Sequence, residues 1–282
     1  MAQTITEHRI AIALSREELL LVMRLLDIAT LPGFDQDWVE VTEGGALIAK
    51  TLAILEAAGN GLAARGYLVP DALDTAAQPR IGLNDQLIAL LMGCANPTTS
   101  LLFETLSSQR AATAQLHWNG IFGVAHTQPI AGVHLFEMIE THAQWLEGAA
   151  ELLHLNDQPS GTLQGTLQID ALDVARAAAQ RFDAAATIAA LTQGGLSVEC
   201  ALALGQAMAD PTALAATVLG LQHGPDDQWH GKFDALVVTP AMCFMLRSAT
   251  LGGDTLTVQQ VAATAIRLWL ATPAGRDREG AA

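Results

Sequence analysis

Apolar residues alternate with other residues at the start of the chain and then change to a helical spacing. In HRIAIAL, Ile10, Ile12 and Leu14 alternate, which predicts a half-buried strand. Ser15 follows, and Glu18 lies three residues further on. A serine and a glutamate at this spacing form a capping box, so a helix is expected over REELLLVMRLLDIA.

The next segments predict two more helices and then a group of strands. An alanine- and leucine-rich helix is expected over about 44–65. Asn84 can cap a helix over DQLIALLMGC, which Pro97 ends. Asn119-Gly120 predicts a two-residue hairpin, because type I′ turns need a positive φ at both central residues. An antiparallel sheet is therefore expected from four short strands, TSLLFETL, ATAQLHW, IFGVAHT and IAGVHLFEMI.

The same order of elements recurs after the polar segment NDQPSGTLQG. A long alanine-rich helix is expected over ALDVARAAAQRFDAAATIAAL, ending at Gly194. Ser197 caps a helix that Pro211 ends, and strand-like segments follow. Thr257 and Gln260 predict a capping box for a last helix over VQQVAATAIRLWLA.

Two landmarks support a duplication. Pro97 and Pro211 lie 114 residues apart, and Thr141 and Thr257, each followed three residues later by glutamine, lie 116 apart. Nearly equal separations within one element order indicate a repeat. We therefore predict an α+β fold in which helical layers flank an antiparallel sheet, in a single pseudo-symmetric domain. Its parts would be half-repeats over about 8–154 and 162–272 and a flexible tail over 273–282.

Several of these segments carry a resemblance to a known family. HRIAIALSREELLLVMRLLDIATLPGF, LAARGYLV, LIALLMGCANP and ALALGQAMADP, within about 8–272, resemble the EspG-type secretion-associated proteins of ESX (type VII) systems. The resemblance implies an EspG-like fold and a cytosolic chaperone that binds the helical tip of PE/PPE secretion substrates. It brings no catalytic residues and no cofactor.

Composition narrows the classes of partner. Hydrophobic residues make up 51% of the chain and charged residues only 15%, against about 25% in typical domains. The net charge of −15, with only two lysines, disfavours nucleic acid and anionic membranes. The three cysteines, Cys94, Cys200 and Cys243, form no CxxC pair and are expected to be buried in a reducing compartment. With no secretory signal and no long apolar run, the expected location is cytoplasmic.

Candidate chemistry is sparse. His126, His134 and His142 recur every eight residues, but they are expected on two strands and a helix start, with Pro129 between the first two. Zinc needs three or four ligands that converge at about 2 Å. HLFEMIETH also lacks the histidine pair of HExxH. We therefore expect no metal site.

The segment HGPDDQWHGKF allows two interpretations. Asp226, Asp227 and His230 could perform acid–base chemistry if they were buried. A solvated hairpin loop explains the proline, glycine and aspartates equally well. Trp229 is then a candidate interface anchor, because exposed aromatic residues on loops often fill that role.

The leading hypothesis is a non-enzymatic chaperone or adaptor that binds an apolar helical segment of another protein. Its candidate partner-binding residues, on or near sheet loops, are Gln109, Arg110, Trp118, Trp229 and Phe233. One alternative is an enzyme or metal protein that uses His126, His134 and Asp226 with Asp227. Another alternative is a structural homo-oligomer, with a homodimer as its simplest form.

Overall fold

The computed structural model describes most of the chain, and the described residues form two compact units. Those residues are 10–32, 34, 49–70, 81–108, 110–248 and 254–272. The first unit takes in the described part of Met1–Thr98 together with Ala114–His142, and the second takes in Thr99–Thr113 with the described part of Ala143–Ala282. None of the described helices is long and apolar enough to cross a membrane.

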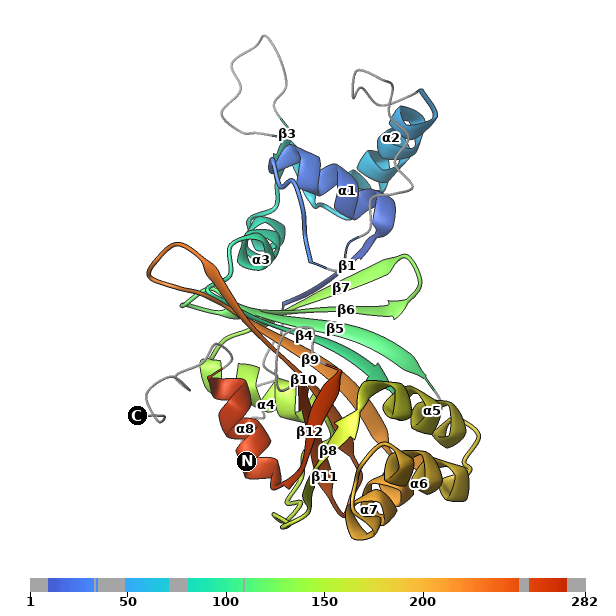
Figure 1. The fold of residues 1–282 in the computed structure, drawn as a ribbon. Coiled ribbons are helices and arrows are strands. Elements are labelled where there is room, and N and C mark those ends of the chain that lie inside the picture. Colours follow the sequence, from blue (N-terminus) through green and yellow to red (C-terminus); the bar gives the residue numbers. More distant parts are fainter. Residues whose placement is uncertain are drawn as a thin grey trace, which may run out of the picture. The chain divides into compact units, whose positions relative to one another are not determined.

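The first unit is a sheet covered on one face by helices. Its strands run antiparallel in the order β1-β7-β6-β5, and helices α1 and α3 pack on one face of them (Figure 1). Helix α2 packs against α1, and β2 and β3 form a separate small hairpin. The elements are β1 (Ala11–Ser15), α1 (Arg16–Leu25), α2 (Ala49–Ala64), β2 (Leu68–Pro70), β3 (Ile81–Leu83), α3 (Asp85–Ala95), β5 (Ala111–Trp118), β6 (Gly123–Ile130) and β7 (Val133–Ile139).

Two predicted helix starts in this unit are confirmed. Ser15 Oγ accepts from the Glu18 N–H at 3.2 Å, and Glu18 Oε2 accepts from the Ser15 N–H at 2.8 Å, which completes the capping box of α1. Arg65 Nη2 lies 2.6 Å from the same Glu18 carboxylate oxygen. Asn84 Oδ1 accepts from the Gln86 N–H at 2.9 Å and caps α3.

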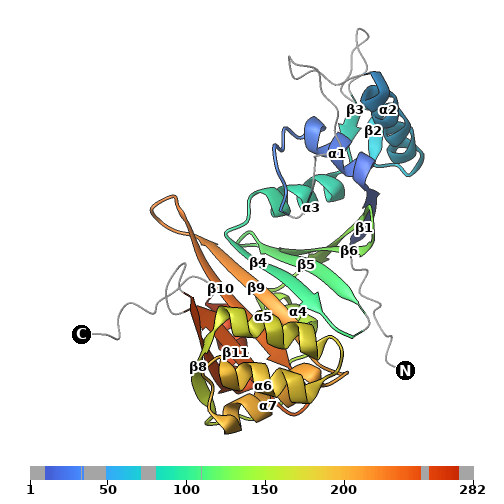
Figure 2. The same cartoon turned by 45° about the vertical axis from the view of Figure 1, so that its right-hand side comes forward.

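The second unit is a sheet between two helical layers. Its strands run antiparallel in the order β4-β9-β10-β11-β12-β8. Helices α5, α6 and α7 cover one face, and α4 and α8 lie against the other (Figures 1 and 2). The elements are β4 (Thr99–Leu106), α4 (His142–Leu152), β8 (Gln164–Gln168), α5 (Ile169–Ala179), α6 (Ala184–Gln193), α7 (Val198–Ala209), β9 (Leu214–His223), β10 (Trp229–Val238), β11 (Cys243–Ser248), β12 (Thr255–Val261) and α8 (Ala263–Ala271).

Both faces of this second sheet are packed. Val237, Phe244 and Leu246 join α5, α6 and α7 in one hydrophobic core. On the other face, the Lys232 ammonium lies 5.8 Å from the centre of the Trp269 ring of α8. The face of β10 that carries Val237 therefore belongs to the core wherever the α5–α7 layer covers it.

The α+β fold with a large antiparallel sheet is confirmed, and one element order occurs twice along the chain. Each part of the chain runs strand, three helices, four strands and a helix, with the β2–β3 hairpin as the addition in the first. The first strand of each part pairs with the fourth of its later strands, β1 with β7 and β8 with β12. Pro97 follows α3 and precedes β4, and Pro211 follows α7 and precedes β9. The two compact units do not coincide with the half-repeats, whose superposition stays a prediction.

Two predicted elements are wrong. Thr257 and Gln260 open no helix, because both lie in β12, where Thr257 pairs with Arg247 of β11, and α8 starts later, at Ala263. The matching of Thr141 with Thr257 is therefore wrong too, since Thr141 directly precedes α4. The long alanine-rich helix is two helices, α5 and α6. They separate at Phe182, whose φ of 56° is incompatible with a right-handed helix.

The Asn119-Gly120 hairpin forms, but its turn is shifted by one residue. The Asn119 N–H donates to the Phe122 carbonyl at 3.2 Å, so Gly120 and Ile121 are the central residues. Gly120 has a φ of 97°, whereas Asn119 is not in the left-handed region. The type I′ turn is therefore replaced by one that needs glycine only at its first central position. The predicted tail over 273–282 lies outside the described residues.

Candidate functional site

Along one face of β10, burial falls from nearly complete to about half. Val237 is 6% exposed and Ala235 packs against the α5–α7 core, but Phe233 is 58% exposed and Trp229 48% exposed. These four residues share a face because side chains alternate along a strand. The cause of the change is visible in Figure 2, where the β9–β10 hairpin extends past the helices of its unit. The same face of β10 is therefore buried under α5–α7 around Val237 and exposed to solvent around Phe233 and Trp229.

Neighbouring strands complete an apolar surface around the two aromatic residues. Phe233 is opposite Leu219 of β9, and Leu219 is opposite Leu102 of β4. Leu221 lies opposite Gly231, and a Cβ at Gly231 would stand 3.1 Å from Leu221 Cδ2, so this glycine leaves room for the leucine. We call this surface the hairpin patch, and its residues are Leu102, Leu219, Leu221, Trp229 and Phe233.

Carboxylates border the hairpin patch at both ends. At one end Glu104 Oε2 accepts a hydrogen bond from Thr217 Oγ1 at 3.3 Å. At the other end the Trp229 ring meets the His223 ring edge-on, 5.3 Å between centroids. His223 Nε2 lies 3.2 Å from Asp227 Oδ1, and Asp227 is 95% exposed. The patch is therefore apolar in the middle and acidic at its ends.

The turn at the hairpin tip does not form a buried acid–base site. Asp227 has a φ of 61° and its N–H donates to the Gly224 carbonyl at 3.2 Å, which closes a tight turn. His230 Nε2 lies 3.1 Å from Asp226 Oδ1, and this hydrogen bond holds the pKa of Asp226 below its usual value. Both side chains are about half exposed, His230 at 52% and Asp226 at 50%. The burial that acid–base chemistry would need is missing here.

The sequence-predicted partner-binding residues do not all lie together. Trp229 and Phe233 share the hairpin patch, although both are in strand β10, of which Trp229 is the first residue, and not in a loop. Arg110 is in the β4–β5 turn, where its carbonyl accepts from the Ser107 N–H at 3.0 Å, at the opposite end of β4 from the hairpin tip. Trp118 belongs to the first unit and meets His142 edge-on at 5.1 Å. Gln109 lies outside the described residues.

The sequence did not single out the leucines of the patch. Leu102, Leu219 and Leu221 looked like ordinary strand residues, and only the strand register places them beside Phe233. The one available signal was their spacing, since apolar residues at alternate positions of VLGLQ share a face.

Two of the histidines form a buried pair in the first unit. His126 Nε2 lies 2.9 Å from His134 Nδ1, and His126 Nδ1 lies 3.1 Å from Gln115 Oε1. His126 stacks on Phe136 at 4.4 Å, and His134 meets Phe34 edge-on at 5.4 Å. The pair is on strands β6 and β7, and His142 opens α4, as the sequence predicted.

Burial keeps these histidines neutral. It lowers the pKa of His126 to about 3, and the nearby His134 and His117 act in the same direction. Burial also lowers the pKa of His117 to about 4 and lowers the pKa of His134. Over the described ranges, no three His, Cys, Asp or Glu side chains lie close enough together to hold a metal ion. The histidines are therefore part of a packed core.

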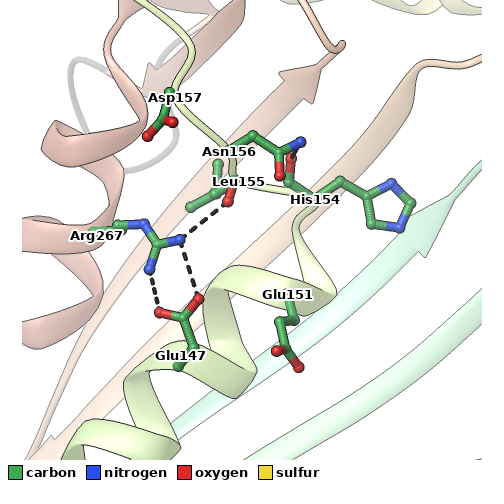
Figure 3. Close-up of a pocket in the computed structure, with 7 residues that line it drawn as sticks. All are labelled: Glu147, Glu151, His154, Leu155, Asn156, Asp157 and Arg267. Atoms are coloured by element: carbon green, nitrogen blue, oxygen red, sulfur yellow. Dashed lines mark hydrogen bonds and ion pairs between the residues drawn. The ribbon is translucent and has the colours of Figure 1, made fainter.

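A pocket of about 580 Å³ lies beside α4 and α8 (Figure 3). Arg267 donates to both carboxylate oxygens of Glu147 and to the Leu155 carbonyl at 3.1 Å, so it ties α8 to α4. The hydrogen bond from Arg267 lowers the pKa of Glu147. Glu151 and His154 also line the pocket, and in Figure 3 their side chains point away from this ion pair. The arrangement links α8 to α4.

The three cysteines offer no reactive thiol. Cys94, Cys200 and Cys243 are buried and unpaired with one another, as expected. Burial raises the pKa of Cys243 to about 11 and also raises that of Cys94 and Cys200. A thiol with a raised pKa holds little of the nucleophilic thiolate at neutral pH.

Comparison with known proteins identifies the fold. No family model matches the sequence, and no curated protein matches it. Among solved structures, this chain is similar to the Mycobacterium tuberculosis type VII secretion system chaperone EspG5, solved in complex with a PE25–PPE41 dimer. The TM-score is 0.56 at 14% identity, and the match covers 95% of this chain and 98% of that one. The predicted resemblance to EspG-type proteins is therefore confirmed at the level of the fold.

Proposed function

We propose that this protein is a non-enzymatic chaperone or adaptor that binds an apolar helical segment of another protein at the hairpin patch. The observation that carries the proposal is the exposure of Trp229 and Phe233 on a sheet face that is core elsewhere. Large apolar surfaces left open on a soluble protein mark interaction sites. The EspG-like fold supports the same function, because EspG5 was solved with a protein dimer bound.

The two aromatic residues can supply useful affinity. A tryptophan or phenylalanine presents about 150–250 Å² of surface, and about half of each is exposed here. Covering about 100 Å² of each, at about 25 cal/mol per Å², contributes about 2.5 kcal/mol per residue. That value is in the range expected of an interface hot spot, about 2 kcal/mol or more.

The proposal includes a place in secretion. In a cell with a type VII system, the chain would act in the cytoplasm and keep a helical secretion substrate of the PE/PPE kind soluble. A neighbouring gene that encodes such a substrate identifies the candidate, and the two purified proteins should then form a complex. Failure of that pair to associate would contradict the secretion role and leave other helical partners to be sought.

The binding site is tested by capture from the native host followed by substitution. We expect Trp229→Ala and Phe233→Ala each to weaken the captured partner by at least tenfold, since each removes a hot-spot side chain. Leu268→Ala is the matched control, because Leu268 is 67% exposed but lies on α8. Equal affinity of all three variants for the partner would show that the hairpin patch is not the binding site.

A further inference from the structure

The charges around the hairpin patch indicate which kind of helix it binds. This inference rests on the proposed function. We propose that the bound segment is an amphipathic helix that lies along the β9–β10 hairpin and carries a basic side chain at each end of its apolar stripe. Three features of the described residues support it: the position of the acidic groups, the absence of lysine and arginine from this face of β4, β9 and β10, and the spacing of the apolar rows.

The acidic groups stand at the two ends of the patch. Glu104 is held beside Thr217 of β9, and Asp227 is held beside His223 of the same strand. Thr217 and His223 are six positions apart in β9, which is about 20 Å along a strand. An α-helix covers about 20 Å in about 13 residues. Lysines or arginines about 13 residues apart on one helix would therefore meet both carboxylates.

No lysine or arginine of the three patch strands competes on this face for those carboxylates. The face of β4, β9 and β10 that carries the patch contains neither lysine nor arginine, and every residue of these three strands is described. Lys232 points to the opposite face, where it lies over the Trp269 ring. A basic partner would thus find the acidic ends available, and electrostatic attraction would speed its association.

The apolar rows between the carboxylates match the turns of a helix. Phe233 and Leu219 make one row, Leu221 the next, and Trp229 the third. Rows two residues apart on a strand are separated by about 7 Å, close to the 5.4 Å rise of one helical turn. Apolar residues three and four positions apart on the partner would lie over successive rows.

A second copy of this chain fits the surface poorly. A symmetric dimer places the same patch of each copy against the other. The carboxylates at the ends of one patch would then approach those of the other, and each chain already carries a net charge of −15. Like charges brought together across an interface oppose association.

The test uses two synthetic helical peptides and the full chain. Both peptides carry one Leu/Phe stripe, and their end positions, about 13 residues apart, are lysine in one and glutamate in the other. Fluorescence anisotropy measures their dissociation constants at 50 mM and 500 mM salt. We expect the lysine peptide to bind at least tenfold more tightly at 50 mM salt, and we expect this preference to shrink severalfold at 500 mM because salt screens exposed charges.

Two double variants test whether the acidic ends of the patch cause the preference for the lysine peptide. Glu104→Lys/Asp227→Lys should abolish the preference for the lysine peptide. Glu56→Lys/Glu151→Lys changes the net charge equally at exposed positions on α2 and α4 and should keep it. Circular dichroism checks that both variants are folded. Equal binding of the two peptides, no binding of the lysine peptide, or a preference that survives Glu104→Lys/Asp227→Lys would overturn the inference.

Phe233→Ala separates this inference from the proposed function. If both peptides bind equally and Phe233→Ala weakens both, the hairpin patch binds helices and the charge specification is wrong. If Phe233→Ala leaves binding of the lysine peptide unchanged, the peptide binds elsewhere, which contradicts the proposed site as well.

Discussion

Acidification should destabilise the first unit well before the carboxylates titrate. His126 and His117 are 3% and 0% exposed, and burial lowers their pKa values to about 3 and about 4. An unfolded histidine titrates near 6.5. Below pH 6.5 the folded state therefore binds fewer protons than the unfolded state. The contribution of the neutral histidines to the free energy of unfolding is fully present above that pH and is lost as the pH decreases toward the folded pKa values.

The size of the effect follows from the width of that window. From pH 6.5 to pH 5 each histidine costs about 1.4 kcal/mol per pH unit, or about 2 kcal/mol. His126 and His117 together should therefore remove about 4 kcal/mol between pH 8 and pH 5. His134, whose pKa burial also lowers, acts in the same direction. Carboxylates with lowered pKa values, such as Asp226, begin to contribute only below about pH 5.

Urea unfolding at pH 8, 7, 6 and 5 measures this loss, with tryptophan fluorescence and circular dichroism as probes. His126→Gln keeps a polar group beside Gln115 without a titrating ring and should reduce the pH dependence by about half. His230→Gln is the control, because His230 is half exposed at the hairpin tip. A free energy of unfolding that changes by less than about 1 kcal/mol over this range would refute the reasoning, since one buried histidine alone predicts about 2. An equal effect of the two substitutions would refute it too.

Further predictions concern stability and symmetry. Arg247→Leu should destabilise the second unit by about 3 kcal/mol or more, because it leaves the fully buried Asp234 carboxylate without the guanidinium that donates to both its oxygens. Urea unfolding measures this loss of stability, and a loss below about 1 kcal/mol would contradict the prediction. Ser15→Ala should cost about 1 kcal/mol through the loss of the α1 cap, seen as a lower thermal midpoint, whereas an unchanged midpoint would show that the cap contributes nothing. An experimental structure should superpose the half-repeats with α3–Pro97–β4 over α7–Pro211–β9, and failure to superpose would refute the duplication.

Local sequence signals predicted the parts of the fold that depend on a few successive residues. The caps at Ser15, Asn84 and Ser197 formed because each side chain reaches an N–H only two or three residues away. The helix start predicted at Thr257 did not form, because contacts outside its own segment decided the structure there. Threonine and glutamine also suit a strand, and β12 pairs on one side with the neighbouring β11 and on the other with β8, which is distant in sequence.

The candidate site was predictable only in part. Trp229 and Phe233 stood out as aromatic residues near a turn, but their exposure depends on where the α5–α7 layer ends, which no short segment of sequence records. The acidic ends could not be predicted from the sequence either, because Glu104 reaches the patch through the pairing of β4 with β9, which are more than 100 residues apart in the chain. Tertiary register therefore created the site from residues that look ordinary in the sequence.

Hydrogen–deuterium exchange on the chain with and without its captured partner tests the central claim most directly. We expect the partner to slow exchange at the backbone amides of β9 and β10 between Leu219 and Phe233, the strand segments that carry most of the hairpin patch. Slowed exchange confined to other elements, such as α2 or the α4–α8 surface around Arg267, with no change in the hairpin, would contradict it.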